Sequence, residues 1–99
     1  MTTDIDIAVS NSQYEPLEAI LVERDYQDEK WGPVHSSGGH TLSGWIIIIE
    51  AELAEAKEAI IKGGRGRDSL RSELVQVAAC VLAALEQHGI QDDHDRRQV

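Results

Sequence analysis

The pattern of apolar and polar positions along the chain predicts three successive helices. Residues 16–31 contain no helix-breaking residue after Pro16, and a first helical turn accepts proline, so the first helix is expected to begin there. Glycine and proline make up half of residues 32–39, which predicts a loop. Thr41 or Ser43 can then cap the helix that follows.

The second helix is expected over residues 42–62, because Gly63 follows directly and a cation before glycine is typical of a helix end. A third helix is expected from Asp68 or Ser69 to Gln87, where the next glycine is close. We therefore predict an all-α chain with about three helices.

Three parts of the chain can be distinguished around these helices. In residues 1–13, Ile5, Ile7 and Val9 alternate with acidic or small residues, a strand-like period that is too short to establish a strand. We interpret this part as an extended N-terminal arm. Residues 14–89 are predicted to form the helical domain, and residues 90–99 a polar C-terminal tail.

Two segments are apolar on nearly every side of the predicted helices. They are residues 45–49 in the second helix and residues 74–85 in the third, where Gln76 is the polar exception. Helices that are hydrophobic all round are buried in larger assemblies, and three helices in one chain cannot cover both segments. We therefore expect a homodimer or homotetramer in which copies of the chain form a multi-helix bundle. A single wrapped core is the alternative.

The charge balance narrows the classes of partner. The 99 residues include 18 acidic and 9 basic side chains, a formal net charge of −9. Such a chain is repelled by a phosphate backbone, so we expect no nucleic acid polymer as partner. No apolar run reaches the length of a membrane span, and the acidic first residues do not resemble a signal peptide. With Cys80 as the only cysteine, a cytoplasmic location is expected.

Acidic side chains recur at helical spacing in the second predicted helix. Glu52, Glu55 and Glu58 are three residues apart, so successive members are rotated by about 60° and form one stripe. The third helix has Glu73 and Gln76 at the same spacing. Antiparallel packing of the two helices would gather these oxygens, and gathered carboxylates are relieved by a divalent cation, Mg²⁺ or Mn²⁺. A solvated acidic face is the alternative interpretation.

The same residues carry a resemblance to a known family. Glu52-Leu-Ala-Glu55, followed after seventeen residues by Glu73-Leu-Val-Gln76, resembles the ExxE…ExxD signature of the MazG-like, all-α nucleoside triphosphate pyrophosphohydrolases. Residues 23–32, ERDYQDEKWG, resemble the ER..Q..KWG segment of phage and bacterial members. The resemblance covers residues 22–89 and is to the MazZ-type phage enzymes. It implies metal-dependent conversion of (d)NTP, with (d)GTP as the expected substrate, to (d)NMP and pyrophosphate, in the host cytoplasm if the chain is phage-encoded.

The resemblance also implies roles for individual acidic residues. Glu52, Glu55 and Glu73 would be the catalytic residues that bind Mg²⁺ or Mn²⁺. Gln76 stands where the family has aspartate, which removes one negative charge from the expected ligand set, and Glu58 would be an accessory ligand. In this view residues 14–89 are a MazG-like catalytic domain.

Substrate binding is expected at the end of the first helix. The resemblance implies that Gln27, Lys30 and Trp31 face the nucleotide, through amide hydrogen bonds, phosphate contact and base stacking respectively. Lys62 belongs to the densest basic group of the chain and could hold a phosphate. The ordinary interpretations are a tryptophan that plugs the core, and cations that cap helix ends.

Two rival functions remain open from the sequence. The chain could be a catalytically silent helical oligomerisation or interaction module, with the acidic stripe as surface. It could also be a relative specific for dUTP or for a phosphoribosyl nucleotide, because one helical scaffold can serve several substrates.

Overall fold

Three α-helices make up the part of the chain that the structure, a computed structural model, describes, namely residues 11–62 and 67–90. They are α2 (Asn11–Trp31), α3 (Leu42–Ile61) and α4 (Arg67–His88). No strand occurs within the described residues. The prediction of an all-α chain with three helices is therefore confirmed.

The first helix begins at Asn11 and not at Pro16, which lies inside it. The prediction of an extended arm up to residue 13 is therefore wrong for residues 11–13, which are helical. Pro16 is the sixth residue of α2, beyond the four N–H groups that lack an acceptor at a helix start, so it removes one backbone hydrogen bond from the second turn. Residues 1–10 of the expected arm lie outside the described residues, as does the expected tail beyond Ile90.

The other helix ends agree with the sequence to within two residues. Thr41 is the N-cap of α3: its backbone is extended, and its Oγ1 accepts a hydrogen bond from the Gly44 N–H at 3.0 Å. Helix α3 ends at Ile61 and α4 at His88. After α4, Gly89 adopts a φ of +79°, a left-handed conformation in which glycine commonly ends a helix.

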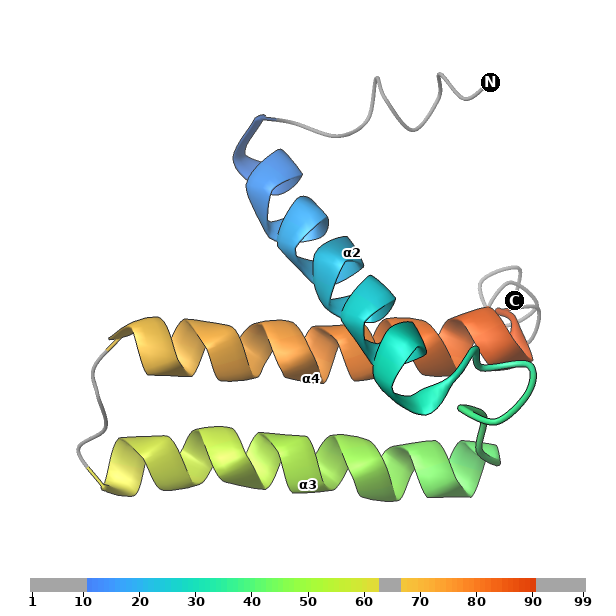
Figure 1. Cartoon of the computed structure of the whole chain (residues 1–99). Helices are drawn as coiled ribbons and strands as arrows, with labels where there is room; N and C mark the ends of the chain where they lie inside the picture. The colour runs from blue at the N-terminus through green and yellow to red at the C-terminus, as the bar shows by residue number, and fades with distance from the viewer. Residues whose placement is uncertain (1–10, 63–66, 91–99) are drawn as a thin grey trace, which may run out of the picture.

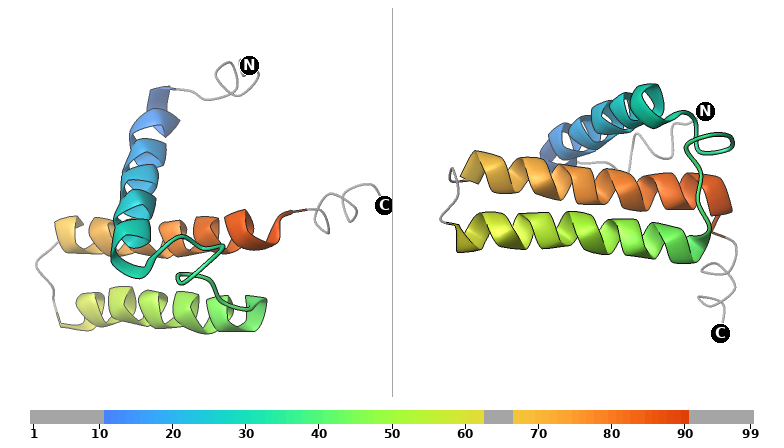
Figure 2. Two further views of the ribbon diagram at one scale, coloured as in Figure 1. Left: turned by 45° about the vertical axis from the view of Figure 1, so that its right-hand side comes forward. Right: turned by 60° about the horizontal axis from the view of Figure 1, so that its bottom comes forward.

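Helix α4 is the central element of the fold. Helix α3 runs antiparallel beside it (Figure 1), and α2 crosses it obliquely on another side, which is clearest in the right-hand view of Figure 2. Among the described helices, α2 packs on α4 and not on α3. The C-terminal half of α2 makes this crossing, and its N-terminal half projects away from the other helices (Figure 1).

The buried core is small and lies near the loop between α2 and α3. Its cluster consists of Val34, Trp45, Ala83 and Ala84, with Ile48 packed against it. No large side chain in the described part of the chain is fully buried. Because hydrophobic stabilisation scales with the apolar area removed from water, this core stabilises a lone chain only weakly.

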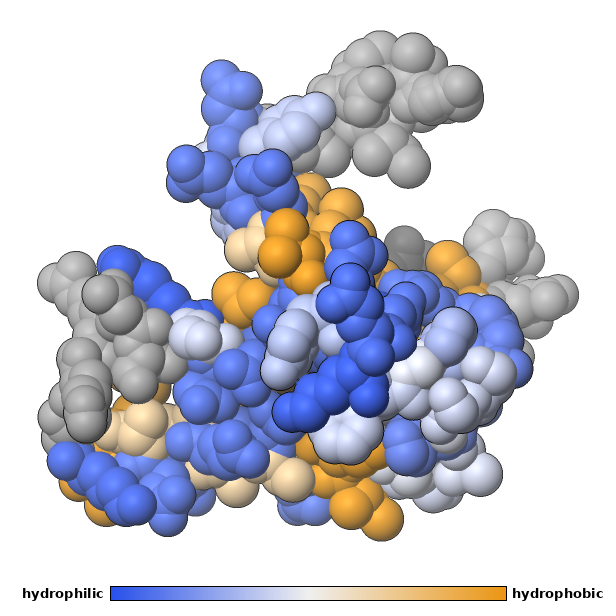
Figure 3. All heavy atoms as spheres, viewed as in Figure 1, coloured by the Kyte–Doolittle hydropathy of each residue, from blue (hydrophilic) through white to orange (hydrophobic). Residues whose placement is uncertain are grey.

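The two segments predicted to be apolar all round are divided between the core and the surface. Trp45, which we expected to face another copy, is buried within its own chain, where its Nε1–H donates to Gln87 Oε1 at 2.7 Å. The neighbouring Ile46 and Ile47 are exposed, and so is Leu74 of the other segment. Hydrophobic patches accordingly remain on the surface over α2 and along α3 (Figure 3). None of the described helices has the length and apolarity needed to cross a lipid bilayer.

Candidate functional site

Three glutamates from two helices converge in the structure. Glu52 and Glu55 of α3 and Glu73 of α4 each offer a carboxylate oxygen, and these oxygens all lie within 4.8 Å of one another. Glu52 and Glu55 are about one turn apart on α3, and the convergence with Glu73 is possible because α4 runs antiparallel beside α3 (Figure 1). The structure thus brings together the three residues expected to be catalytic.

The electrostatics of this carboxylate cluster (Glu52, Glu55 and Glu73) are unfavourable without a cation. Glu52 Oε1 and Glu73 Oε1 are buried and have no hydrogen-bond partner among the described residues. Burial raises the pKa of the Glu52 carboxyl above its ordinary value, and the charges of Glu55, Glu73 and Glu23 raise it further. Unit charges 4 Å apart interact by about 4 kcal/mol at an effective dielectric near 20. Protonation or a divalent cation would relieve the cluster, and its hard oxygens suit Mg²⁺ or Mn²⁺.

The remaining predicted ligands differ in their positions. Gln76 follows Glu73 on α4, is half-buried, and lines the same pocket as Glu52. Glu58 lies outside the carboxylate cluster, because the rotation of about 60° at each step of the stripe turns the third member away from α4. Its carboxylate is 3.9 Å from the Lys62 ammonium, and both side chains are exposed. Lys62, expected to hold a phosphate, does not line the pocket.

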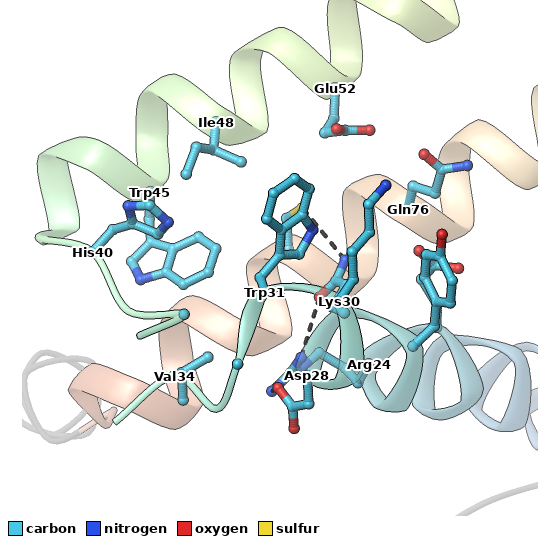
Figure 4. A pocket seen from close by; sticks show the side chains of 16 residues that line it. Arg24, Asp28, Lys30, Trp31, Val34, His40, Trp45, Ile48, Glu52 and Gln76 are labelled. Carbon is cyan, nitrogen blue, oxygen red and sulfur yellow. Dashed lines mark hydrogen bonds and ion pairs between the residues drawn. The ribbon is translucent and has the colours of Figure 1, made fainter. Parts of the chain in front are cut away.

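A pocket of about 410 Å³ extends from Glu52 and Gln76 to the end of α2 and the following loop. Its size falls in the range of small-molecule sites. Gln27, Lys30 and Trp31 all line it, so the structure also brings together the three α2 residues expected to bind substrate. Figure 4 shows Glu52 projecting from α3 and Gln76 from α4 toward this space.

The end of the pocket away from the carboxylates is aromatic. The Trp31 side chain is 62% exposed, so it is a wall of the pocket and not a core plug. The Lys30 ammonium lies 4.9 Å from the Trp31 ring centroid and 5.7 Å from that of Tyr26. The His40 ring meets Trp45 edge-on at 4.9 Å between centroids (Figure 4). A flat, partly apolar ligand can therefore stack at this end.

The loop between α2 and α3 completes the aromatic end of the pocket, which Gly32, Val34, Gly38 and His40 line. Gly32 adopts a φ of +97°, and a Cβ on Gly38 would collide with the Gly32 carbonyl oxygen, so the loop requires glycine at both positions. Gln87 of α4 fixes the loop, because its Oε1 accepts from the His40 N–H at 3.0 Å and from the Trp45 indole.

Sequence reasoning missed an ion pair beside the pocket, between the buried Arg24 and the partly exposed Glu86. Arg24 donates from Nε and Nη2 to the two carboxylate oxygens of Glu86 at 2.9 and 2.8 Å, and Nη2 lies 3.0 Å from Asp28 Oδ1. The hydrogen bond between them raises the pKa of Arg24 and lowers that of Glu86. The i, i+3, i+4, i+7 spacing of Arg24, Gln27, Asp28 and Trp31 could have placed them on one face of a helix, but it does not indicate Glu86 as the partner.

Comparisons with known proteins add no identification. The sequence matches no model of a protein family, and no curated protein and no solved structure is significantly similar to it. The carboxylate cluster and the adjoining pocket are therefore the features of this chain that indicate a function.

Proposed function

We propose that the chain is a divalent-cation-dependent nucleoside triphosphate pyrophosphohydrolase of the MazG-like type. The observation that carries this proposal is the convergence of Glu52, Glu55 and Glu73, with two buried and unpartnered carboxylate oxygens, beside a pocket that can hold a nucleoside. The proposal extends to (d)GTP as substrate, which follows from the resemblance of the motifs, and to the cytoplasm as location.

Glu52, Glu55 and Glu73 would hold Mg²⁺ or Mn²⁺, and the Gln76 side-chain oxygen would be a neutral ligand or would orient one. Such a cation polarises phosphoryl oxygens and lowers the pKa of a water that can attack the α-phosphorus. The exposed Glu55 carboxylate is the member of the cluster best placed to exchange a proton with solvent. The products would be a nucleoside monophosphate and pyrophosphate.

The remaining pocket residues fit the rest of such a substrate. The Lys30 ammonium lies over one face of the Trp31 ring and offers a positive charge for a phosphate, and the opposite face of the indole is the one on which a purine can stack. Gln27 offers amide hydrogen bonds. A chain of net charge −9 needs a cation to approach a triphosphate, and the carboxylate cluster would provide its site.

The test is a panel of ribo- and deoxynucleoside triphosphates incubated with the full chain and Mg²⁺ or Mn²⁺, read for pyrophosphate and for the monophosphate formed. We expect release of pyrophosphate, greatest with guanine nucleotides, and its loss in Glu55→Gln. Glu50→Gln is the matched control, because Glu50 is an exposed glutamate of α3 outside the cluster. Turnover that is unchanged in Glu55→Gln, or equally reduced in both variants, would overturn the assignment of the site.

A second candidate function, helical self-assembly, is favoured by the exposed apolar residues. On α3, four of them fall within about 40° of rotation, which makes one stripe. These residues are Leu42, Ile46, Leu53 and Ile60. On α4, Leu74, Val81 and Leu85 are exposed and share a face in the same way. We infer that a second copy covers these stripes in a homodimer or homotetramer, because the core of one chain is small.

Light scattering after size exclusion tests this assembly. We expect the unmodified chain to run as a dimer or tetramer, and the double variant Ile46→Lys with Leu53→Lys to run as a monomer. Glu58→Lys is the control, since Glu58 is exposed on α3 and lies off the stripe. An unmodified chain that is monomeric at assay concentrations would contradict the assembly without bearing on the carboxylate cluster.

A further inference from the structure

Arg24 is the only polar or charged residue of the described chain that is buried, with 4% of its surface exposed. Its paired hydrogen bonds to Glu86 of α4 fix the plane of the guanidinium group. In this plane Nη1 points to Gln27 and donates to its Oε1 at 3.2 Å. A contact between two helices therefore determines which group meets the Gln27 amide, and Arg24, Gln27 and Asp28 all line the pocket.

The chemistry of the guanidinium allows one orientation of that amide. Arginine is only a donor, so it can meet the amide oxygen, whereas the opposite orientation would place donors against donors. With the oxygen engaged, Gln27 Nε2 is turned toward Cys80 Sγ at 3.7 Å, a weak acceptor that can engage one of its two N–H groups. The other N–H is available to a molecule in the pocket, which Gln27 lines.

We propose that Arg24 is a positioning residue that makes Gln27 a hydrogen-bond donor, and not an acceptor, toward the pocket. The consequence for ligands rests on the proposed function. A base edge with a ring carbonyl oxygen at this point is accepted, whereas an exocyclic amino group meets a second donor and leaves both unpaired. Such a mismatch costs about tenfold or more in affinity. Arg24 thus sets the selectivity between oxo and amino bases through Gln27, while its own hydrogen bonds go to Glu86 and Gln27.

The positioning role is tested first without any ligand, by nuclear Overhauser effects in the full chain. We expect a cross-peak between the Gln27 side-chain amide protons and the β protons of Cys80, and its loss in Arg24→Met. Glu86→Gln leaves an acceptor for Arg24 and should keep the cross-peak. Lys57→Met, which removes one exposed cation from α3, controls for the change of charge. Absence of the cross-peak in the unmodified chain, or its persistence in Arg24→Met, overturns the proposal.

Selectivity is tested by titrating the same proteins with dIMP, which carries a ring carbonyl, and dAMP, which carries an amino group, and following tryptophan fluorescence. In the unmodified chain the Kd for dIMP should be lower by about tenfold or more. Arg24→Met should bring the two Kd values together, Glu86→Gln should keep them apart, and Gln27→Glu, which offers only acceptors, should favour dAMP. Equal selectivity in the unmodified chain and Arg24→Met overturns the proposal. If the unmodified chain binds neither nucleotide, the proposed function is contradicted, and the cross-peak still decides the role of Arg24.

Discussion

Helix α4 meets each of its two neighbouring helices at a cluster of charged side chains. One cluster pairs opposite charges, and the other brings like charges together. Where α2 crosses α4, Arg24 meets Glu86 and Asp28, so positive and negative groups lie within 3.0 Å of each other. Where α3 runs beside α4, Glu52, Glu55 and Glu73 bring three like charges together, with one carboxylate oxygen of each within 4.8 Å of the others. Both clusters are partly shielded from water, so the sign of each contact matters more than it would at the surface.

The pKa shifts show how the two clusters differ energetically. The contact with Arg24 lowers the pKa of Glu86, so the folded chain favours its charged form. Burial and neighbouring carboxylates raise the pKa of Glu52, so the folded chain disfavours its charged form. The ion pair between Arg24 and Glu86 therefore stabilises the fold without any ligand. The carboxylate cluster lowers the stability of the fold, and binding of a divalent cation would offset this loss. Because perturbed, energetically unfavourable carboxylates are typical of functional sites, the carboxylate cluster is the functional candidate, whereas the Arg24–Glu86 ion pair holds α2 against α4.

The largest expected effect comes from removing one charge of the carboxylate cluster. Glu52→Gln should reduce metal-dependent pyrophosphate release by about a hundredfold or more, because a cation supplies several kcal/mol of transition-state stabilisation. Calorimetric titration with Mn²⁺ alone should show weaker binding in the same variant. Unchanged Mn²⁺ affinity would mean that the cluster is an acidic surface and that the two charge clusters do not differ in function.

The next largest effect is expected from removing Arg24, the cation that contacts Glu86 and Asp28, and it should be a loss of stability. Arg24→Met leaves Glu86 and Asp28 without their cation and should lower the free energy of unfolding by about 2 kcal/mol, a value reduced from that of a fully buried pair because Glu86 is partly exposed. Urea denaturation at constant protein concentration measures this change. If Arg24→Met unfolds at the same urea concentration as the unmodified chain, the ion pair is not what holds α2 on α4.

The two clusters should also give opposite dependences of stability on pH. Because the pKa of Glu52 is raised in the folded state, its contribution falls as pH rises from the ordinary glutamate pKa to the raised one, and Mn²⁺ should reverse this loss. Because the pKa of Glu86 is lowered, its contribution is complete above the ordinary pKa and is lost as pH falls through the lowered one. Urea denaturation across this pH range should show the first slope vanish in Glu52→Gln and the second in Glu86→Gln.

The smallest effect is expected at Glu58. Its contact with Lys62 is long and exposed at both ends, so Glu58→Gln should change the free energy of unfolding by no more than about 0.5 kcal/mol. Mn²⁺ affinity should stay the same, since Glu58 lies outside the carboxylate cluster. A clear loss of Mn²⁺ affinity would restore the accessory-ligand role that the sequence suggested and the structure does not support.

Local signals predicted most of the secondary structure and part of the site. Glycine and proline marked the loop over residues 32–39, and Thr41 was one of the two candidate caps, because these features depend on the backbone of a few consecutive residues. The i, i+3 spacing of Glu52 and Glu55 was enough to place them on one face. Pro16 misled the prediction of the first helix, since its effect depends on how far upstream the helix extends.

Long-range partners could not be predicted in this way. The pairing of Arg24 with Glu86 joins residues 62 positions apart, and neither residue signals the other. The separation of Glu58 from the carboxylate cluster depends on the rotation of α3 against α4, and the burial of Trp45 on a hydrogen bond to Gln87. To predict any of these contacts, one must know which faces of the helices meet. Hydrophobic periodicity indicates those faces only coarsely here, because all three helices carry exposed apolar residues.

By itself the sequence determined the three helices, most of their ends to within two residues, and the acidic residues available for a cation, because these depend on spacing along one chain segment. Only the tertiary structure decided which carboxylates converge, that the indoles of Trp31 and Trp45 line one pocket, and which arginine contacts the Gln27 amide. The physical reason is that electrostatic and hydrogen-bond energies depend on distances of a few ångström between side chains from different helices. Those distances are set by helix packing around α4.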